Sequence, residues 1–173
     1  MAKQATLEYL MDYPTWLDPA DKGAASVIRN AHRDAATHAM EDFKKHRLPG
    51  RFTGQLAGHL GFDQRKPGYE RRKAKRGKRG KTHNWTGRSF SIARNAPVKV
   101  TGRAEKGAVK IPIRGLPAGY RRGFTSYGGI NLRAELEHIS SAELTRFARL
   151  YQKRFIRFLK TDPKAVRRRR KFI

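Results

Sequence analysis

Residues Ser140 to Lys160 read SSAELTRFARLYQKRFIRFLK, and this stretch predicts the most clearly defined element of the chain. Ser140 followed three residues later by Glu143 is the capping-box pattern, which begins an α-helix. Apolar side chains then recur at helical spacing; they are Leu144, Phe147, Leu150, Tyr151, Phe155, Phe158 and Leu159. Because Asp162-Pro163 stops a helix, we expect this one to end near Lys160.

A second long helix is predicted over residues 24–46. Small or apolar side chains fall at helical spacing there; they are Ala24, Val27, Ile28, Ala31, Ala35, Ala39, Met40 and Phe43. Asp21 is the expected N-cap, and Leu48-Pro49-Gly50 marks the expected end of the helix. Because the stripe is rich in alanine, another element should pack closely against it.

The first 22 residues are predicted to form an N-terminal extension. Pro14 and Pro19 forbid one continuous helix across it, although a short helical turn is expected near residues 7–11. Trp16 and Leu17 are expected to anchor this extension in the protein's own core, and the alternative is an anchor on a neighbouring subunit.

A β-hairpin is predicted over residues 97–113, where β-branched side chains alternate with polar ones. Gly102 to Gly107 suits the connecting loop. Pro112 cannot donate to a ladder, which indicates an edge of the sheet. Another short strand is expected at residues 90–93. These elements predict a single α+β domain over residues 1–173, with two long helices packed on a small antiparallel β-sheet.

The connecting segments are predicted to be irregular. Residues 51–62 hold apolar side chains that could be buried, but three glycines disfavour a helix there, so we expect irregular structure or a short strand near Leu60. Residues 114–129 contain five glycines and predict a long loop.

Two segments concentrate positive charge. Residues 64–88 read QRKPGYERRKAKRGKRGKTHNWTGR, with ten Lys or Arg and one acid between Arg65 and Lys81. We expect an extended arm that is mobile from Lys73 to His83 until an anionic partner or a neighbouring subunit orders it; the alternative is a solvated loop. The basic C-terminal tail, residues 161–173, is expected to be extended or only partly helical, the alternative being a solvated terminus.

The candidate contacts to phosphate or to another subunit are the cations of these two segments. They are Arg65, Lys66, Arg71, Arg72, Lys73, Lys75, Arg76, Lys78, Arg79, Lys81, Arg88, Arg167, Arg168, Arg169, Arg170 and Lys171.

The overall composition also indicates an anionic partner. The 173 residues include 40 Lys or Arg and 14 Asp or Glu, for a formal net charge of +26. This charge exceeds what solubility requires and indicates phosphate backbones or acidic protein surfaces as partners. There is no cysteine, and no apolar run reaches the length of a membrane span. We therefore expect no membrane partner.

The sequence predicts no catalytic, cofactor-binding or metal site, and hence no enzyme. The six histidines form no close pair at metal-ligand spacing, and the acids are scattered. Gly80-Lys81-Thr82 lacks the first glycine of a P-loop, since position 75 is lysine. Composition leaves open a metal-free ribonuclease of toxin type. Aromatic residues among the basic and glycine-rich segments are expected to be buried rather than to stack on bases.

The order of these features resembles minor virion proteins of tailed phages, the neck, head–tail connector and tail-completion class. The resemblance rests on FDQR at 62–65, YERRKA at 69–74, WTGR at 85–88 and LRAELEHIS at 132–140, and it covers roughly residues 24–159. The sequence departs from the family at Ser89-Phe90, where a leucine is common.

The resemblance implies a non-enzymatic ring subunit with an α+β fold and no cofactor. Its arms would contact neighbouring subunits, with the DNA phosphate backbone as a further, sequence-independent contact. Partners would be copies of the chain and portal, adaptor or tail proteins. The protein would then be found in the virion, and in the host cytoplasm during assembly. The alternative is a ribosome-associated or general nucleic-acid-binding protein.

Overall fold

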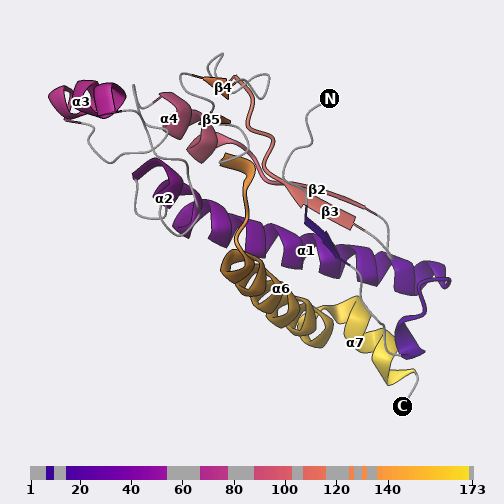
Figure 1. The fold of residues 1–173 in the computed structure, drawn as a ribbon. Coiled ribbons are helices and arrows are strands. Elements are labelled where there is room, and N and C mark those ends of the chain that lie inside the picture. The colour runs from indigo at the N-terminus through magenta and orange to yellow at the C-terminus, as the bar shows by residue number, and fades with distance from the viewer. Residues whose placement is uncertain are drawn as a thin grey trace. The chain divides into compact units, whose positions relative to one another are not determined.

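The computed structural model describes residues 7–9, 15–53, 67–77, 88–102, 107–115, 125–126, 130–131 and 136–171 (Figure 1). The elements of this part are β1 (Leu7–Tyr9), a 3₁₀ turn (Thr15–Leu17), α1 (Lys22–His46), α2 (Leu48–Thr53), α3 (Pro67–Lys75), α4 (Arg88–Asn95), β2 (Lys99–Gly102), β3 (Gly107–Lys110), β4 (Thr125–Ser126), β5 (Ile130–Asn131), α6 (Ser141–Thr161) and α7 (Pro163–Arg170). The described part is mainly helical with small antiparallel sheets, which confirms the α+β class.

The chain divides into two compact units. The helix–sheet unit comprises residues 6–41, 98–111 and 144–173, and the central unit comprises residues 1–5, 42–97 and 112–143. Helices α1 and α6 each cross the boundary, so each contributes residues to both units.

Helix α1 begins where the sequence predicts. Asp21 is the cap, because its Oδ1 accepts the Ala24 N–H at 2.9 Å and satisfies a donor that the first turn leaves unpaired. The buried face repeats every three to four residues and includes Val27, Ile28 and Ala31. Its many alanines present little side-chain bulk, which permits a close neighbour.

Helix α6 confirms the predicted capping box. The Ser140 hydroxyl accepts the Glu143 N–H at 3.2 Å, and the Glu143 carboxylate accepts the Ser140 N–H at 3.0 Å. Within the helix–sheet unit, the rings of Tyr151 and Phe155 stack with centroids 6.2 Å apart. His32 of α1 lies against both of these rings and is hydrogen-bonded to the Tyr151 hydroxyl, so it is a packing residue of this unit.

The predicted C-terminal tail is a helix over most of its length. The Asp162 carboxylate accepts the N–H groups of Lys164 and Ala165, both at 3.0 Å, and Pro163 occupies the first helical position, where a missing N–H costs nothing. The expectation of a partly helical tail is therefore confirmed, and the alternative of an extended one is wrong for residues 163–170. Asp162-Pro163 ends one helix and begins the next.

A cluster of buried apolar side chains joins α1, α7 and the 3₁₀ turn. Leu17, Ala24, Val27, Ile28 and Ala165 are buried together, with Trp16 and Leu159 packed against them. This confirms that Trp16 and Leu17 anchor the N-terminal extension in the protein's own core.

The sheet of the helix–sheet unit has the strand order β1-β3-β2 and is antiparallel throughout. The β2–β3 pairing confirms the predicted hairpin, with Val100 opposite Val109. Strand β1 pairs Leu7 with Val109, so the helical turn expected there is wrong. Pro112 lies beyond the end of β3, which is the central strand and not an edge.

The central unit differs most from the sequence prediction. Residues 88–95 are helical, so the strand expected at 90–93 is wrong: Ser89 and Ala93, four residues apart, form the buried face of α4. Residues 51–53 belong to α2 and are not irregular, with Pro49 in the first turn, where proline is tolerated. The Phe52 ring packs 5.4 Å from that of Phe90. Most of the predicted loop at 114–129 and residues 54–62 lie outside the described residues.

Candidate functional site

The described part of the predicted basic arm is a helix. Pro67–Lys75 form α3, with Glu70 in its first turn and Lys75 in its last, the arrangement that the helix dipole favours. The expectation of a mobile segment from Lys73 is therefore wrong at its start. Gly77 follows with a φ of 64°, a left-handed conformation that glycine adopts without strain.

Lys73 differs from its neighbours because it is buried. Its side chain is 1% exposed, and its Nζ lies 5.3 Å from the centre of the Tyr69 ring, which is a cation–π contact. The other cations of this stretch, Arg71, Arg72, Lys75 and Arg76, are exposed. Lys73 therefore belongs to the packing of the central unit and not to its basic surface.

The remaining predicted contacts fall in three groups. Arg88 is exposed at the first position of α4. Arg65, Lys66, Lys78, Arg79 and Lys81 lie outside the described residues. The cations of the tail lie on α7, where Arg167, Arg169, Arg170 and Lys171 are exposed. The arm and tail residues belong to different compact units.

Arg168 is the exception on α7. Its Nη1 lies 3.0 Å from the Asp21 carboxylate, and its Nε donates to the Trp16 carbonyl at 3.1 Å. The Ala24 N–H and the Arg168 guanidinium together hold the pKa of Asp21 below its ordinary value. Arg168 therefore connects the last helix to the cap of the first, which is a structural role.

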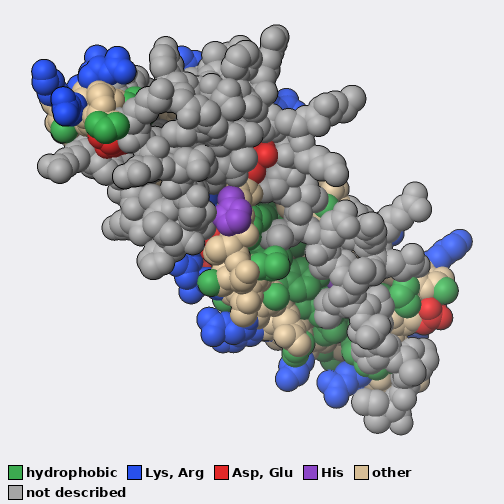
Figure 2. Space-filling model, viewed as in Figure 1, with side chains coloured by type: hydrophobic (Ala, Val, Ile, Leu, Met, Phe, Trp, Pro, Cys, Tyr) green, Lys and Arg blue, Asp and Glu red, His purple; other side chains and the backbone are tan. Residues whose placement is uncertain are grey.

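Helix α6 carries a second set of cations that sequence reasoning did not single out. Arg149, Lys153, Arg157 and Lys160 are all exposed, and none forms an ion pair within the part of the chain that the structure describes. Figure 2 shows Lys and Arg side chains projecting along the edge that α6 forms in that view. Their spacing of four, four and three residues was the available signal.

Arg154 of the same helix has a carboxylate partner. Its Nε and Nη2 donate to the two carboxylate oxygens of Asp34 on α1, at 2.6 and 3.1 Å. This fork-like contact raises the pKa of Arg154 above its ordinary value. Arg154 and Arg168 thus both meet carboxylates, whereas the exposed cations of α6 meet none among the described residues.

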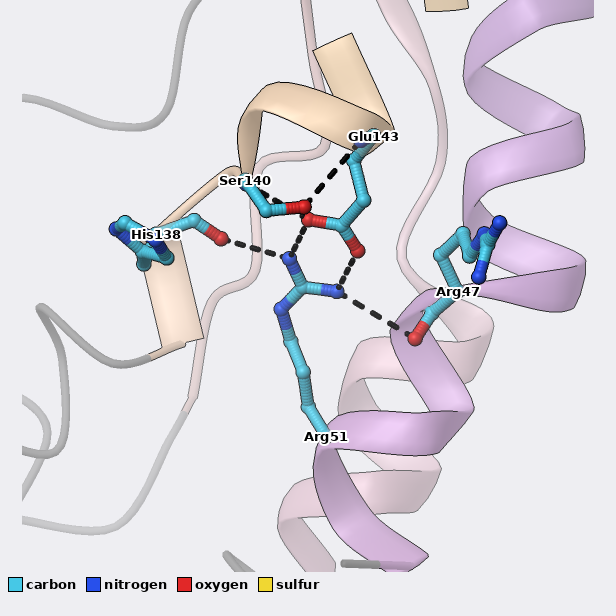
Figure 3. Close-up of polar contacts among 5 residues, drawn as sticks. All are labelled: Arg47, Arg51, His138, Ser140 and Glu143. Carbon is cyan, nitrogen blue, oxygen red and sulfur yellow. Dashed lines mark hydrogen bonds and ion pairs between the residues drawn. The ribbon is translucent and has the colours of Figure 1, made fainter. Parts of the chain in front are cut away.

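The strongest polar cluster of the central unit centres on Arg51 of α2 (Figure 3). Its Nη1 and Nη2 donate to the two oxygens of Glu143 at 2.9 and 2.8 Å, and Nη2 also donates to the His138 carbonyl at 2.6 Å. The Arg51 side chain is fully buried, and that of Glu143 is 5% exposed. This bidentate pair fixes α2 to the first turn of α6.

Glu143 is ionised in this cluster. Burial alone would raise the pKa of its carboxyl, but the Arg51 guanidinium and the Ser140 N–H outweigh burial and hold the pKa below its ordinary value of 4.5. One carboxylate therefore completes a helix cap and neutralises a buried cation. The cap is recognisable in the sequence, whereas the role of Arg51 is not, because the pair joins residues 92 positions apart.

Two searches confined to the described residues found no further site. They contain no group of three or more His, Asp or Glu placed to hold a metal ion. No helix among them is both long and apolar enough to span a membrane. In comparisons with known proteins, no family model, no curated protein and no solved structure matches the chain.

Proposed function

We propose that this protein is a non-enzymatic structural subunit of a tailed-phage virion, which forms part of the head–tail connector or neck, or completes the tail. In this proposal it assembles as a homo-oligomeric ring in the host cytoplasm and contacts portal, adaptor or tail proteins. Its basic segments meet neighbouring subunits and the DNA backbone. The finer architecture that accompanies the proposal is two long helices packed on the small antiparallel sheet.

The observation that carries the proposal is the placement of positive charge. Exposed cations occupy α3, α6 and α7, and the formal net charge is +26. Self-repulsion of this size destabilises an isolated monomer, so neutralising surfaces from subunits or nucleic acid would add stability. The resemblance to neck and tail-completion proteins gives this charge a setting in which many subunits surround DNA.

Electron microscopy of the purified protein at high concentration, together with antibody labelling of virions, tests the proposal. Rings and label at the neck are expected. A matched pair of variants tests the basic arm: replacement of Arg71, Arg72, Lys75 and Arg76 by Gln should impair ring formation. Replacement of Lys22, Arg29, Arg33 and Lys45, four exposed cations of α1, should not. A compact monomer at every concentration, together with absence from virions, would refute the proposal.

A ribosome-associated or general nucleic-acid-binding protein is the second candidate. It is favoured by the exposed cations on the folded helices α6 and α7, since a folded cationic surface can bind phosphate without assembly into a ring. Co-sedimentation with ribosomes, and its loss at high salt, would support this function. A protein that stays in the supernatant at low salt would exclude it.

A further inference from the structure

Helix α6 and the helix that follows it are almost devoid of acidic residues. From Leu144 to Ile173 the chain holds Asp162 as its single acid, against twelve Lys or Arg. The Asp162 carboxylate is already engaged as the cap of α7. Two of the twelve cations, Arg154 and Arg168, form ion pairs with acids near or on α1. Nine of the others are exposed; they are Arg149, Lys153, Arg157, Lys160, Lys164, Arg167, Arg169, Arg170 and Lys171.

Four of these cations form a stripe on α6. At about 100° of rotation per residue, Arg149, Lys153, Arg157 and Lys160 fall within a sector of about 80°. This sector lies opposite the buried side of the helix, which carries Phe147, Tyr151 and Phe155. The stripe extends about 16 Å along the axis, from eleven residue steps of about 1.5 Å. Four cationic side chains therefore project from one ordered face of the helix.

Repulsion among the cations of the stripe destabilises helix α6. Like charges four residues apart, as in Arg149 with Lys153 and Lys153 with Arg157, destabilise a helix by about 0.2–0.5 kcal/mol per pair. The opposite face, packed on His32 and its neighbours, stabilises α6 despite this repulsion. An arrangement that costs stability in isolation becomes favourable once an anionic partner neutralises it.

We infer that this stripe, defined by Arg149, Lys153, Arg157 and Lys160, is a docking face for the phosphate backbone of double-stranded DNA. Its cations would each neutralise a phosphate and release a bound counterion, which gives sequence-independent affinity. Ile156 lies about 20° outside this sector and is 43% exposed, while no aromatic side chain of α6 is exposed. The stripe therefore offers no stacking platform for the bases of a single strand.

A duplex of B-form DNA fits this face better than duplex RNA. The major groove of B-DNA is about 12 Å wide and admits a helix edge between its two backbones, whereas that of A-form RNA is too deep and narrow for side chains to enter. The binding face is part of the folded helix–sheet unit. The inference therefore goes beyond the proposed function and does not require the protein to be in a ring or in a virion.

The test measures the affinity of the full-length protein for mixed-sequence duplex DNA of about three helical turns, over a series of salt concentrations. In the stripe variant, the four cations are replaced by Gln, which is a good helix former. The slope of log K against log[salt] should become shallower by about 3.6, because four contacts contribute about 0.9 each. The α1 variant, with Lys22, Arg29, Arg33 and Lys45 replaced by Gln, loses the same charge and should change the slope by less than about 1.

Two further sets of measurements make the result decisive. A charge-conserving variant, Arg149→Lys with Arg157→Lys, should keep the wild-type slope, and far-UV circular dichroism should show unchanged helix content in every variant. Duplex RNA and poly-glutamate serve as alternative polyanions. The substitutions of the stripe variant should weaken the binding of each of them less than they weaken the binding of duplex DNA. The inference is overturned if the stripe variant keeps the wild-type slope for DNA, if the α1 variant loses as much, or if only poly-glutamate binding depends on the stripe. None of these outcomes bears on ring formation, which electron microscopy tests separately.

Discussion

The buried pair of Arg51 and Glu143 should be the polar contact on which the central unit depends most. Glu143→Gln keeps the shape of the side chain but leaves the buried Arg51 guanidinium without its counter-charge. The two guanidinium–carboxylate hydrogen bonds are 2.9 and 2.8 Å long, and both side chains are nearly inaccessible to solvent. Removing one partner from such a pair costs about 3–5 kcal/mol, because the remaining charge is desolvated and unpaired. This is a large part of the roughly 5–15 kcal/mol that stabilises an ordinary domain.

Urea denaturation followed by far-UV circular dichroism measures this loss as a fall in the unfolding midpoint. Glu70→Gln is the control, because Glu70 is only half-buried in the first turn of α3 and its replacement should change the free energy of unfolding by less than about 1 kcal/mol. The double variant Arg51→Met with Glu143→Leu should regain at least half of the loss, since no buried charge remains. The reasoning is refuted if Glu143→Gln costs under about 1 kcal/mol, or if the double variant is no more stable than the single one.

Two further predictions concern acid pH and the last helix. The pKa of Glu143 is lowered on folding, so its contribution to stability is complete above its ordinary value of 4.5 and is lost as pH falls through the lower folded value. The urea midpoint should therefore decrease once the pH is lowered below about 4.5, and it should decrease less steeply in Glu143→Gln. Equal dependence of the midpoint on pH in the two proteins would contradict this. Asp162→Ala removes two hydrogen bonds from the start of α7 and should cost about 1 kcal/mol with a loss of helix content. Thr161→Ala, next to the cap, is the control, and equal effects of the two substitutions would argue against the cap.

The elements that the sequence predicted correctly are those whose signals are local. Both long helices carry a cap and an apolar stripe within their own residues, at Asp21 for α1 and at Ser140 with Glu143 for α6. The β2–β3 hairpin likewise joins strands that are close in sequence. Each of these predictions needed only side chains a few positions apart.

The wrong predictions had local signals with two meanings. Asp162-Pro163 was correctly interpreted as the stop of α6, which ends at Thr161, but Asp is also a good N-cap and Pro a good first residue, and the helix α7 that they begin was predicted only in part. Over residues 88–95 the apolar residues Phe90 and Ile92 alternate as in a strand, while Ser89 and Ala93 share one helical face. The packing of Phe52 on Phe90 is a contact that only the folded central unit provides.

Features that depend on distant residues were not predictable from one sequence. Strand β1 pairs with a segment about a hundred residues later, and Arg51 meets a carboxylate 92 residues away. The burial of Lys73 belongs to the same class, since nothing in a run of cations marks the one that turns inward. The charge of the candidate site could be predicted, but its division into structural and exposed cations could not.

That division changes which part of the chain is best suited to bind a polyanion. Any segment that a partner must order loses backbone entropy of about 1–2 kcal/mol per residue, and its phosphate contacts must first offset this cost. The backbone of the stripe on α6 is already ordered by the packing of Phe147, Tyr151 and Phe155, so binding through its four cations would cost side-chain entropy but no further backbone entropy. Helix α7 is ordered as well, since it is capped by Asp162 and connected to Asp21 through Arg168. The cations of α6 and α7 should therefore contribute to the affinity for phosphate without this cost.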